Sequence, residues 1–153
     1  MATPTPEPEP LIRLLWRAHN WFRAAVIAAL DAGDDPATIT AAQATLLSQL
    51  PSDGASIAEL ARLIGVSSPT VHQWVHELVA MDALTVEPDP ASARTKLVRL
   101  TESGHRRRAR TMRLLAGIEA NLAEVIGAGT VDALRAALEA PWGDPEAAAG
   151  SRS

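Results

Sequence analysis

Residues 56–104 read SIAELARLIGVSSPTVHQWVHELVAMDALTVEPDPASARTKLVRLTESG. In the first half of this stretch apolar residues recur at three- and four-residue steps, and a Gly-Val-Ser turn at 65–67 separates two short helical patterns. Two segments rich in Val, Leu and Thr, 84–87 and 95–100, flank the Pro-containing run 88–94 and predict a β-hairpin. This order predicts a winged helix-turn-helix, a fold that is mainly α with a small β wing.

Two helix starts, one before this stretch and one at its first residue, have the spacing of a capping box. Thr40 precedes Gln43 by three residues, and Ser56 precedes Glu59 by three, so each hydroxyl is placed to accept from a backbone N–H of the first turn. The first helix stops near residues 51–54, and Gly65 ends the second as a C-terminal cap. Their apolar faces are expected to be Ala44, Leu47 and Leu50 in one helix and Ile57, Leu60, Ala61 and Ile64 in the other.

The helix after the turn has one apolar and one polar face. Ser68 before Pro69 predicts the N-cap and the first helical residue, with the helix running to about Asp82. At 100° per residue the apolar side is Val71, Trp74, Val75, Leu78 and Val79. The opposite, outer side carries Pro69, Thr70, His72, Gln73 and His76, with no Lys or Arg.

Longer apolar-striped helices are expected on both sides of this lobe, over 11–32, 102–126 and 130–140. The run 33–36, Gly-Asp-Asp-Pro, is expected to end the first, and Met112, Leu115, Ile118, Leu122 and Val125 form the stripe of the second. One domain over 11–140 follows, with its helix-turn-helix lobe at 40–104. The Pro-rich segment 1–10 and the small, polar segment 141–153 are expected to be disordered tails.

Composition limits the possible functions. Cysteine is absent, which excludes disulfides and thiol redox sensing and is compatible with the cytoplasm, and no apolar run is long enough for a membrane span. Residues 85–113 hold eight Lys or Arg and three Asp or Glu, a net charge of +5. The rest of the chain holds six Lys or Arg and fifteen Asp or Glu, a net charge of −9. Such a segment suits phosphate contact, although a solvated arginine-rich helix has the same composition.

The order and spacing of these motifs resemble those of the MarR family of bacterial transcription regulators. The resemblance rests on residues 56–61 and 66–71, then Leu78, Leu84, Asp89-Pro90 and Arg94, and it closes on Leu-Val-Arg-Leu-Thr-Glu-Ser-Gly at 97–104. It covers roughly residues 11–140. It implies a homodimer joined through the terminal helices, which would place two reading helices about 34 Å apart on a pseudo-palindromic duplex.

The resemblance also implies roles for single residues. Ser68 and Thr70 stand where family members contact phosphates, and Gln73 stands where many carry a guanine-reading Arg, so preference is expected to shift toward adenine. Arg94 matches an arginine that enters the minor groove, although Ser92 and Ala93 replace the usual Asp and first Arg beside it. The expected DNA-binding residues are Ser68, Thr70, His72, Gln73, His76, Arg94 and Lys96.

A family pocket for anionic aromatic effectors implies a second candidate site. Trp16 and Phe22 are candidates to stack on such a ring, and His19 or Arg23 to meet its charge; packing within a dimer interface is the alternative role for the same residues. His72 and His76 have metal-compatible spacing, but groove-facing histidines are the favoured interpretation, so neither a metal nor a cofactor is expected.

Three function classes remain open from the sequence. The first is a DNA-binding regulator, more often a repressor, that a small effector releases. The second is a protein of the same fold that binds DNA weakly and has been recycled for ligand binding or catalysis, which the Arg-free outer helix face keeps open. The third is a protein-interaction module. No nucleophile with a partner, Gly-rich phosphate loop or paired carboxylates accompany the motif, so an enzyme is not expected.

Overall fold

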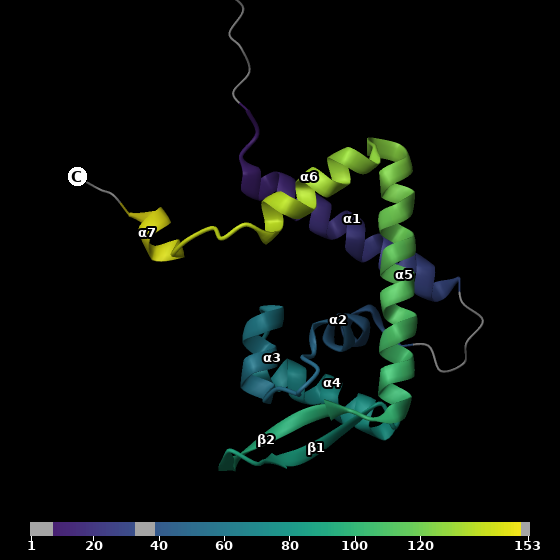
Figure 1. Ribbon diagram of the computed structural model, residues 1–153, viewed down its shortest axis with the longest axis vertical. Coiled ribbons are helices and arrows are strands. Elements are labelled where there is room, and N and C mark those ends of the chain that lie inside the picture. Colours follow the sequence, from purple (N-terminus) through teal and green to yellow (C-terminus); the bar gives the residue numbers. More distant parts are fainter. Residues whose placement is uncertain (1–7, 33–38, 151–153) are drawn as a thin grey trace, which may run out of the picture. The chain divides into compact units, whose positions relative to one another are not determined.

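The computed structural model describes residues 8–32 and 39–150 (Figure 1). Within them the chain is mainly helical with one antiparallel hairpin, which confirms the expected fold class. The elements are α1 (Leu11–Asp31), α2 (Ala41–Gln49), α3 (Ile57–Ile64), α4 (Ser68–Ala80), β1 (Leu84–Asp89), β2 (Ser92–Leu100), α5 (Glu102–Ile126), α6 (Ala128–Glu139) and α7 (Pro145–Ala149).

Two compact units divide the chain between Leu115 and Ala116, inside α5. The first unit contains a hydrophobic core built from α2, α3, α4 and the hairpin. Its fully buried large side chains are Leu46, Leu47, Leu50, Leu60, Val71, Leu78 and Val98. Every apolar position expected on α2 and α3 is buried or packs against this core. This lobe therefore has its own hydrophobic core, and α4 and the hairpin expose their polar residues on its surface.

Both predicted capping boxes are present. The Thr40 hydroxyl accepts from the Gln43 backbone N–H at 3.2 Å while the Gln43 side chain accepts from the Thr40 N–H at 3.0 Å. Ser56 and Glu59 make the same reciprocal pair at 3.2 and 2.8 Å. Gly65 ends α3 in the left-handed region, φ 78°, where a residue without Cβ has no steric cost.

Both ends of α4 differ from the sequence prediction. Its N-cap is Ser67, not Ser68, because the Ser67 hydroxyl accepts from the Thr70 N–H and Pro69 occupies the second helical position, where its missing N–H is equally harmless. The helix stops at Ala80 rather than near Asp82. Asp82 takes φ 54°, and the Ala83 N–H bonds back to the Leu78 carbonyl at 2.8 Å, which closes the C-terminus.

The hairpin strands are longer than expected, so that only residues 90–91 lie between them. Pairing runs from Leu84–Leu100 to Pro88–Lys96 and resumes at Asp89–Ser92, so β2 has three extra residues, 93–95, at this irregularity. At the base, Val98 exchanges both backbone hydrogen bonds with Ala55, at 2.8 and 3.2 Å. The wing is thereby fastened to the segment between α2 and α3.

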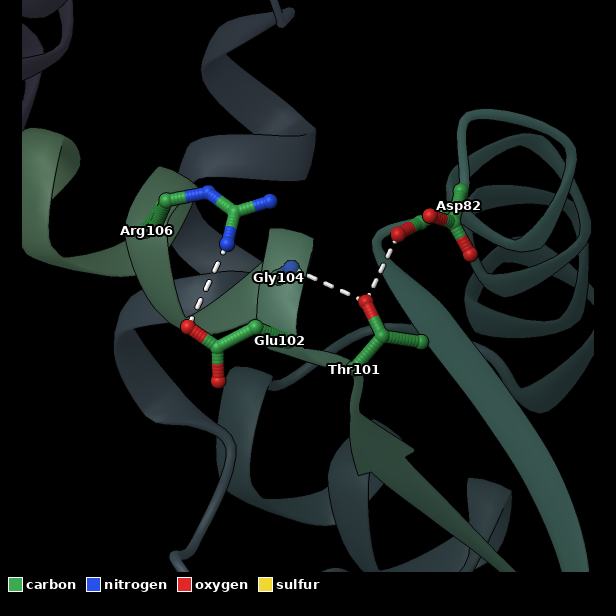
Figure 2. Close-up of polar contacts among 5 residues, drawn as sticks. All are labelled: Asp82, Thr101, Glu102, Gly104 and Arg106. Atoms are coloured by element: carbon green, nitrogen blue, oxygen red, sulfur yellow. Dashed lines mark hydrogen bonds and ion pairs between the residues drawn. The ribbon is translucent and has the colours of Figure 1, made fainter.

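Thr101 joins the wing to α5 (Figure 2). Its hydroxyl accepts from the Gly104 N–H at 2.9 Å, as an N-cap does, and donates to the Asp82 carbonyl at 2.6 Å. A Cβ on Gly104 would overlap the Ala83 carbonyl oxygen, so only glycine allows this close approach. The Leu-Thr-x-x-Gly pattern is therefore a joint that ties the end of α4, the wing and α5 together.

The long helices agree with the prediction except at α6, which begins at Ala128 behind a Gly127 N-cap with φ 91°, not at Thr130. The expected end of α1 at 33–36 lies outside the described residues, as do 1–7 and 151–153 of the expected tails, whereas 145–149 of the second tail form α7. Within the described ranges no single helix is long and apolar enough to cross a membrane. The pair α5 and α6 meets that requirement only jointly, with a 120° bend.

Apolar side chains of these long helices are largely exposed in the single chain. None of the 21 residues of α1 is buried. In the expected stripe of α5, Ile118 is buried, but Met112 and Val125 are 47% and 81% exposed. The exposed large apolar residues of α1 and α6 are Leu11, Ile12, Leu14, Trp16, Trp21, Ile27, Leu134 and Leu138.

Candidate nucleic-acid interface

The outer face of α4 is polar and open to solvent. Ser68, His72, Gln73 and His76 are all exposed, as the helical periodicity predicts. The inner face buries Val71, Val75 and Leu78 and half-buries Trp74. Val79, expected on the inner face, is instead 41% exposed, because it lies at the last turn of the helix, where the core ends.

The Thr70 side chain already has a hydrogen-bond partner within the turn. Its hydroxyl lies 2.7 Å from the Ser67 hydroxyl, and its backbone N–H donates to the same oxygen at 3.3 Å. The residue is half-buried, whereas Ser68 is exposed in the first helical position, where the positive end of the helix dipole favours an anion. Ser67 is thus a further hydroxyl at this end of α4 that the sequence interpretation assigned to the turn.

Gln73 is held by a neighbour that the sequence interpretation did not single out. Its amide nitrogen donates to Glu77 Oε1 at 3.1 Å, and Glu77 Oε2 accepts from the Gln43 amide at 2.8 Å. The first contact spans one helical turn and is visible as an i, i+4 pair. The second joins residues 34 positions apart, and no local pattern predicts it.

At the wing tip, Arg94 and Lys96 are exposed. Arg94 lies in the three-residue irregularity of β2, a kind of distortion that re-aims side chains at strand ends. Ser92 stands where the family has an Asp, and at this tip Asp89 Oδ1 accepts from the Ala91 N–H at 2.8 Å. The Thr95 hydroxyl also donates to the Ser92 hydroxyl at 3.0 Å, so short polar contacts stabilise the tip.

The basic segment 85–113 is only partly a solvated surface. Arg108 is half-buried and donates to the Leu50 carbonyl at 2.8 Å, which fastens the start of α5 to the end of α2. Arg106 pairs with Glu102 at 3.2 Å, and Arg99 lies 3.8 Å from Glu87. Several of its positive charges therefore have structural contacts, and Arg94 and Lys96 carry the charge of the exposed tip.

An open cleft of about 990 Å³ lies within the first unit. Three of the four effector candidates, His19, Phe22 and Arg23, line it from α1, but Trp16 does not line it and is 68% exposed. Across the cleft stand Thr40 at the start of α2 and Trp74 from α4. The cleft therefore touches both the core-facing side of α4 and the N-cap of α2.

His72 and His76 lie one turn apart on α4, both exposed. Among residues 8–32 and 39–150 there is no group of three or more His, Asp or Glu side chains arranged to hold a metal ion.

Comparison with known proteins identifies the class to which this lobe belongs. The family model described as MarR family matches residues 37–95, from before α2 through the wing tip. No curated protein sequence matches the chain. The lobe at residues 37–95 therefore matches the MarR family, and the chain has the winged helix-turn-helix fold of that class of DNA-binding transcriptional regulators.

Solved structures agree over most of the chain. The reduced form of MarR from E. coli has a TM-score of 0.72 at 25% identity, over 88% of this chain and 97% of that one. CouR of Rhodococcus jostii RHA1, a transcriptional repressor solved on a 23-mer DNA duplex, has a TM-score of 0.69 at 26% identity, over 84% of this chain and 89% of that one. A Mycobacterium tuberculosis MarR family protein in complex with salicylic acid has a TM-score of 0.68 at 26% identity, over 87% of this chain and 96% of that one.

Proposed function

We propose that this regulator is a cytoplasmic repressor that binds a pseudo-palindromic operator as a homodimer and that a small anionic aromatic molecule releases it. The observation that carries the proposal is the exposed polar face of α4, Ser68, His72, Gln73 and His76, on the same lobe as a wing tip with exposed Arg94 and Lys96. A polar helix face and a basic loop are the shapes that the major and minor grooves accept.

Exposed apolar surface supports the dimer. A 21-residue helix with no buried residue is unusual in a chain that works alone, since apolar stripes stabilise a protein only when they are covered. Twofold pairing of identical chains is the commonest way to cover such a surface. Light scattering during size-exclusion chromatography is expected to give twice the chain mass; a monomer would contradict the proposal.

The cleft supports the effector. Phe22 and Trp74 offer aromatic surface, and His19 and Arg23 offer donors for a carboxylate. The salicylic acid complex of a relative at 26% identity gives a first compound to test. Salicylate is expected to lower the affinity for DNA and to change the fluorescence of Trp74; no change in either would exclude it as an effector.

DNA recognition is tested by a gel shift with the duplex upstream of the chain's own gene. Affinity is expected to fall by orders of magnitude between about 50 and 200 mM salt, because phosphate contacts release counterions. A selection from randomised half-sites then separates the roles within α4. Gln73→Ala is expected to relax preference at one base pair per half-site, whereas Ser68→Ala lowers affinity for all sequences alike. A wild type that selects no motif would favour the recycled-fold alternative.

A further inference from the structure

Three side chains form a continuous hydrogen-bonded series from the core-facing side of α2 to the outer face of α4. Gln43 donates to Glu77 Oε2 at 2.8 Å, and Gln73 donates to Glu77 Oε1 at 3.1 Å. Each carboxylate oxygen therefore receives one amide. The series ends on the side chain that stands where the family reads a base.

The anchor of the series has a single possible orientation. Gln43 is only 5% exposed, and its Oε1 accepts from the Thr40 backbone N–H at 3.0 Å while its Nε2 donates to Glu77. Turning the amide over would face nitrogen toward an N–H donor and oxygen toward a carboxylate, losing both bonds. Glu77, which is half-buried, is thus held from the protein side by a buried group that cannot rearrange cheaply.

Gln73 benefits from this anchoring because a glutamine side chain has three rotatable bonds, and an exposed one samples many orientations. The amide nitrogen carries two N–H groups. Glu77 occupies one, and the second, together with Oε1, is the donor and acceptor pair that matches adenine N7 and N6. A fixed orientation lowers the entropic cost of making that pair on DNA.

We propose that Glu77 is a positioning residue for base recognition: from its anchor on Gln43 it sets the Gln73 amide in its reading orientation without contacting DNA itself. The inference rests on the proposed function, in which Gln73 reads a base. It predicts an uncommon combination of effects for Glu77→Gln. Discrimination between base pairs falls, because Gln43 and Gln73 both donate to Glu77 and an amide at 77 would turn its own N–H donors toward at least one of them. Non-specific affinity rises, because a negative charge is removed from the DNA-facing helix.

The test compares full-length wild type with Gln73→Ala, Glu77→Gln and their double variant. Glu124→Gln, an exposed α5 position, is the matched charge control. Each protein is first used in the half-site selection. Its affinity is then measured for the preferred duplex, for duplexes with single base changes and for a scrambled duplex, with circular dichroism as a check on folding.

Glu77→Gln is expected to lower discrimination about tenfold at the base pair that Gln73→Ala affects, and to bind the scrambled duplex more tightly. The double variant should discriminate no worse than Gln73→Ala alone, and Glu124→Gln should discriminate as wild type does. Gln43→Met, which removes the anchor but keeps both partners, should cause a loss at the same base pair.

Three outcomes would overturn the inference. If Gln73→Ala loses discrimination and Glu77→Gln keeps it, Glu77 does not position Gln73. If Glu77→Gln acts at another base pair, Glu77 reads a base directly. If it weakens preferred and scrambled duplexes equally, its role is structural. Failure of the proposed function looks different, since the wild type would then select no motif and all variants would match it.

Discussion

Replacing Thr101 by Val is expected to destabilise the protein by about 2 kcal/mol, because an almost isosteric change removes the hydroxyl at the joint between the wing and α5. Loss of the N-cap bond to the Gly104 N–H costs about 1 kcal/mol. Loss of the bond to the Asp82 carbonyl, in a residue that solvent reaches, adds roughly another 1 kcal/mol. For a chain of this length the midpoint of thermal unfolding should fall by about 4–8 °C.

Urea and thermal unfolding followed by circular dichroism measure this change. Thr85→Val is the matched control, since it makes the same exchange in β1 at a residue whose hydroxyl has no hydrogen bond among the described residues. The control should stay within about 0.5 kcal/mol of wild type. Equal stabilities for the two variants would refute the assignment of Thr101 as the cap that fastens α5.

Three further changes test the lobe. Arg94→Ala should weaken DNA binding by about 1 to 3 kcal/mol, most on A·T-rich flanks and with unchanged circular dichroism; untouched binding would mean that the wing does not enter the groove. Hydrogen bonds from the Ser56 backbone and hydroxyl lower the pKa of Glu59. Its extra stability over Glu59→Gln should therefore be complete at neutral pH and be lost as pH falls from the ordinary glutamate pKa through the lowered one, which unfolding curves at several pH values would show. Phe22→Ala should weaken salicylate binding in calorimetry, whereas Trp16→Ala, outside the cleft, should not.

Local signals predicted most of the lobe. Both capping boxes and the Gly65 stop act between residues at most four positions apart, so the sequence contains the whole interaction. Where two residues could serve equally, the prediction failed: adjacent Ser67 and Ser68 can each cap a helix, and proline is tolerated in either of the first two positions. The helix α6 was expected to begin at residue 130 and begins at Ala128, because a glycine such as Gly129 near a helix start is compatible with a helix as well as with a loop.

The candidate site was less predictable, for a physical reason. Helical periodicity places Gln73 on the outer face, but the orientation of its amide depends on Gln43, which only the packing of α2 against α4 brings near. Likewise, the extent of the wing depends on polar contacts at its tip and not on the β propensity of residues 88–94. Contacts between distant residues decide which polar groups are available, and residue order alone does not contain them.

The pair of backbone hydrogen bonds between Val98 and Ala55 determines where this wing can change its length. A slip of one position at the base would turn Val98 out of the core and bring Leu97 or Arg99 into its place, since successive strand residues face opposite sides. Beyond Pro88 the pairing is already irregular, and none of the side chains that the structure describes there is buried. A change in the length of the wing should therefore be tolerated at the tip and not at the base, because only at the tip does the lobe beneath keep its packing.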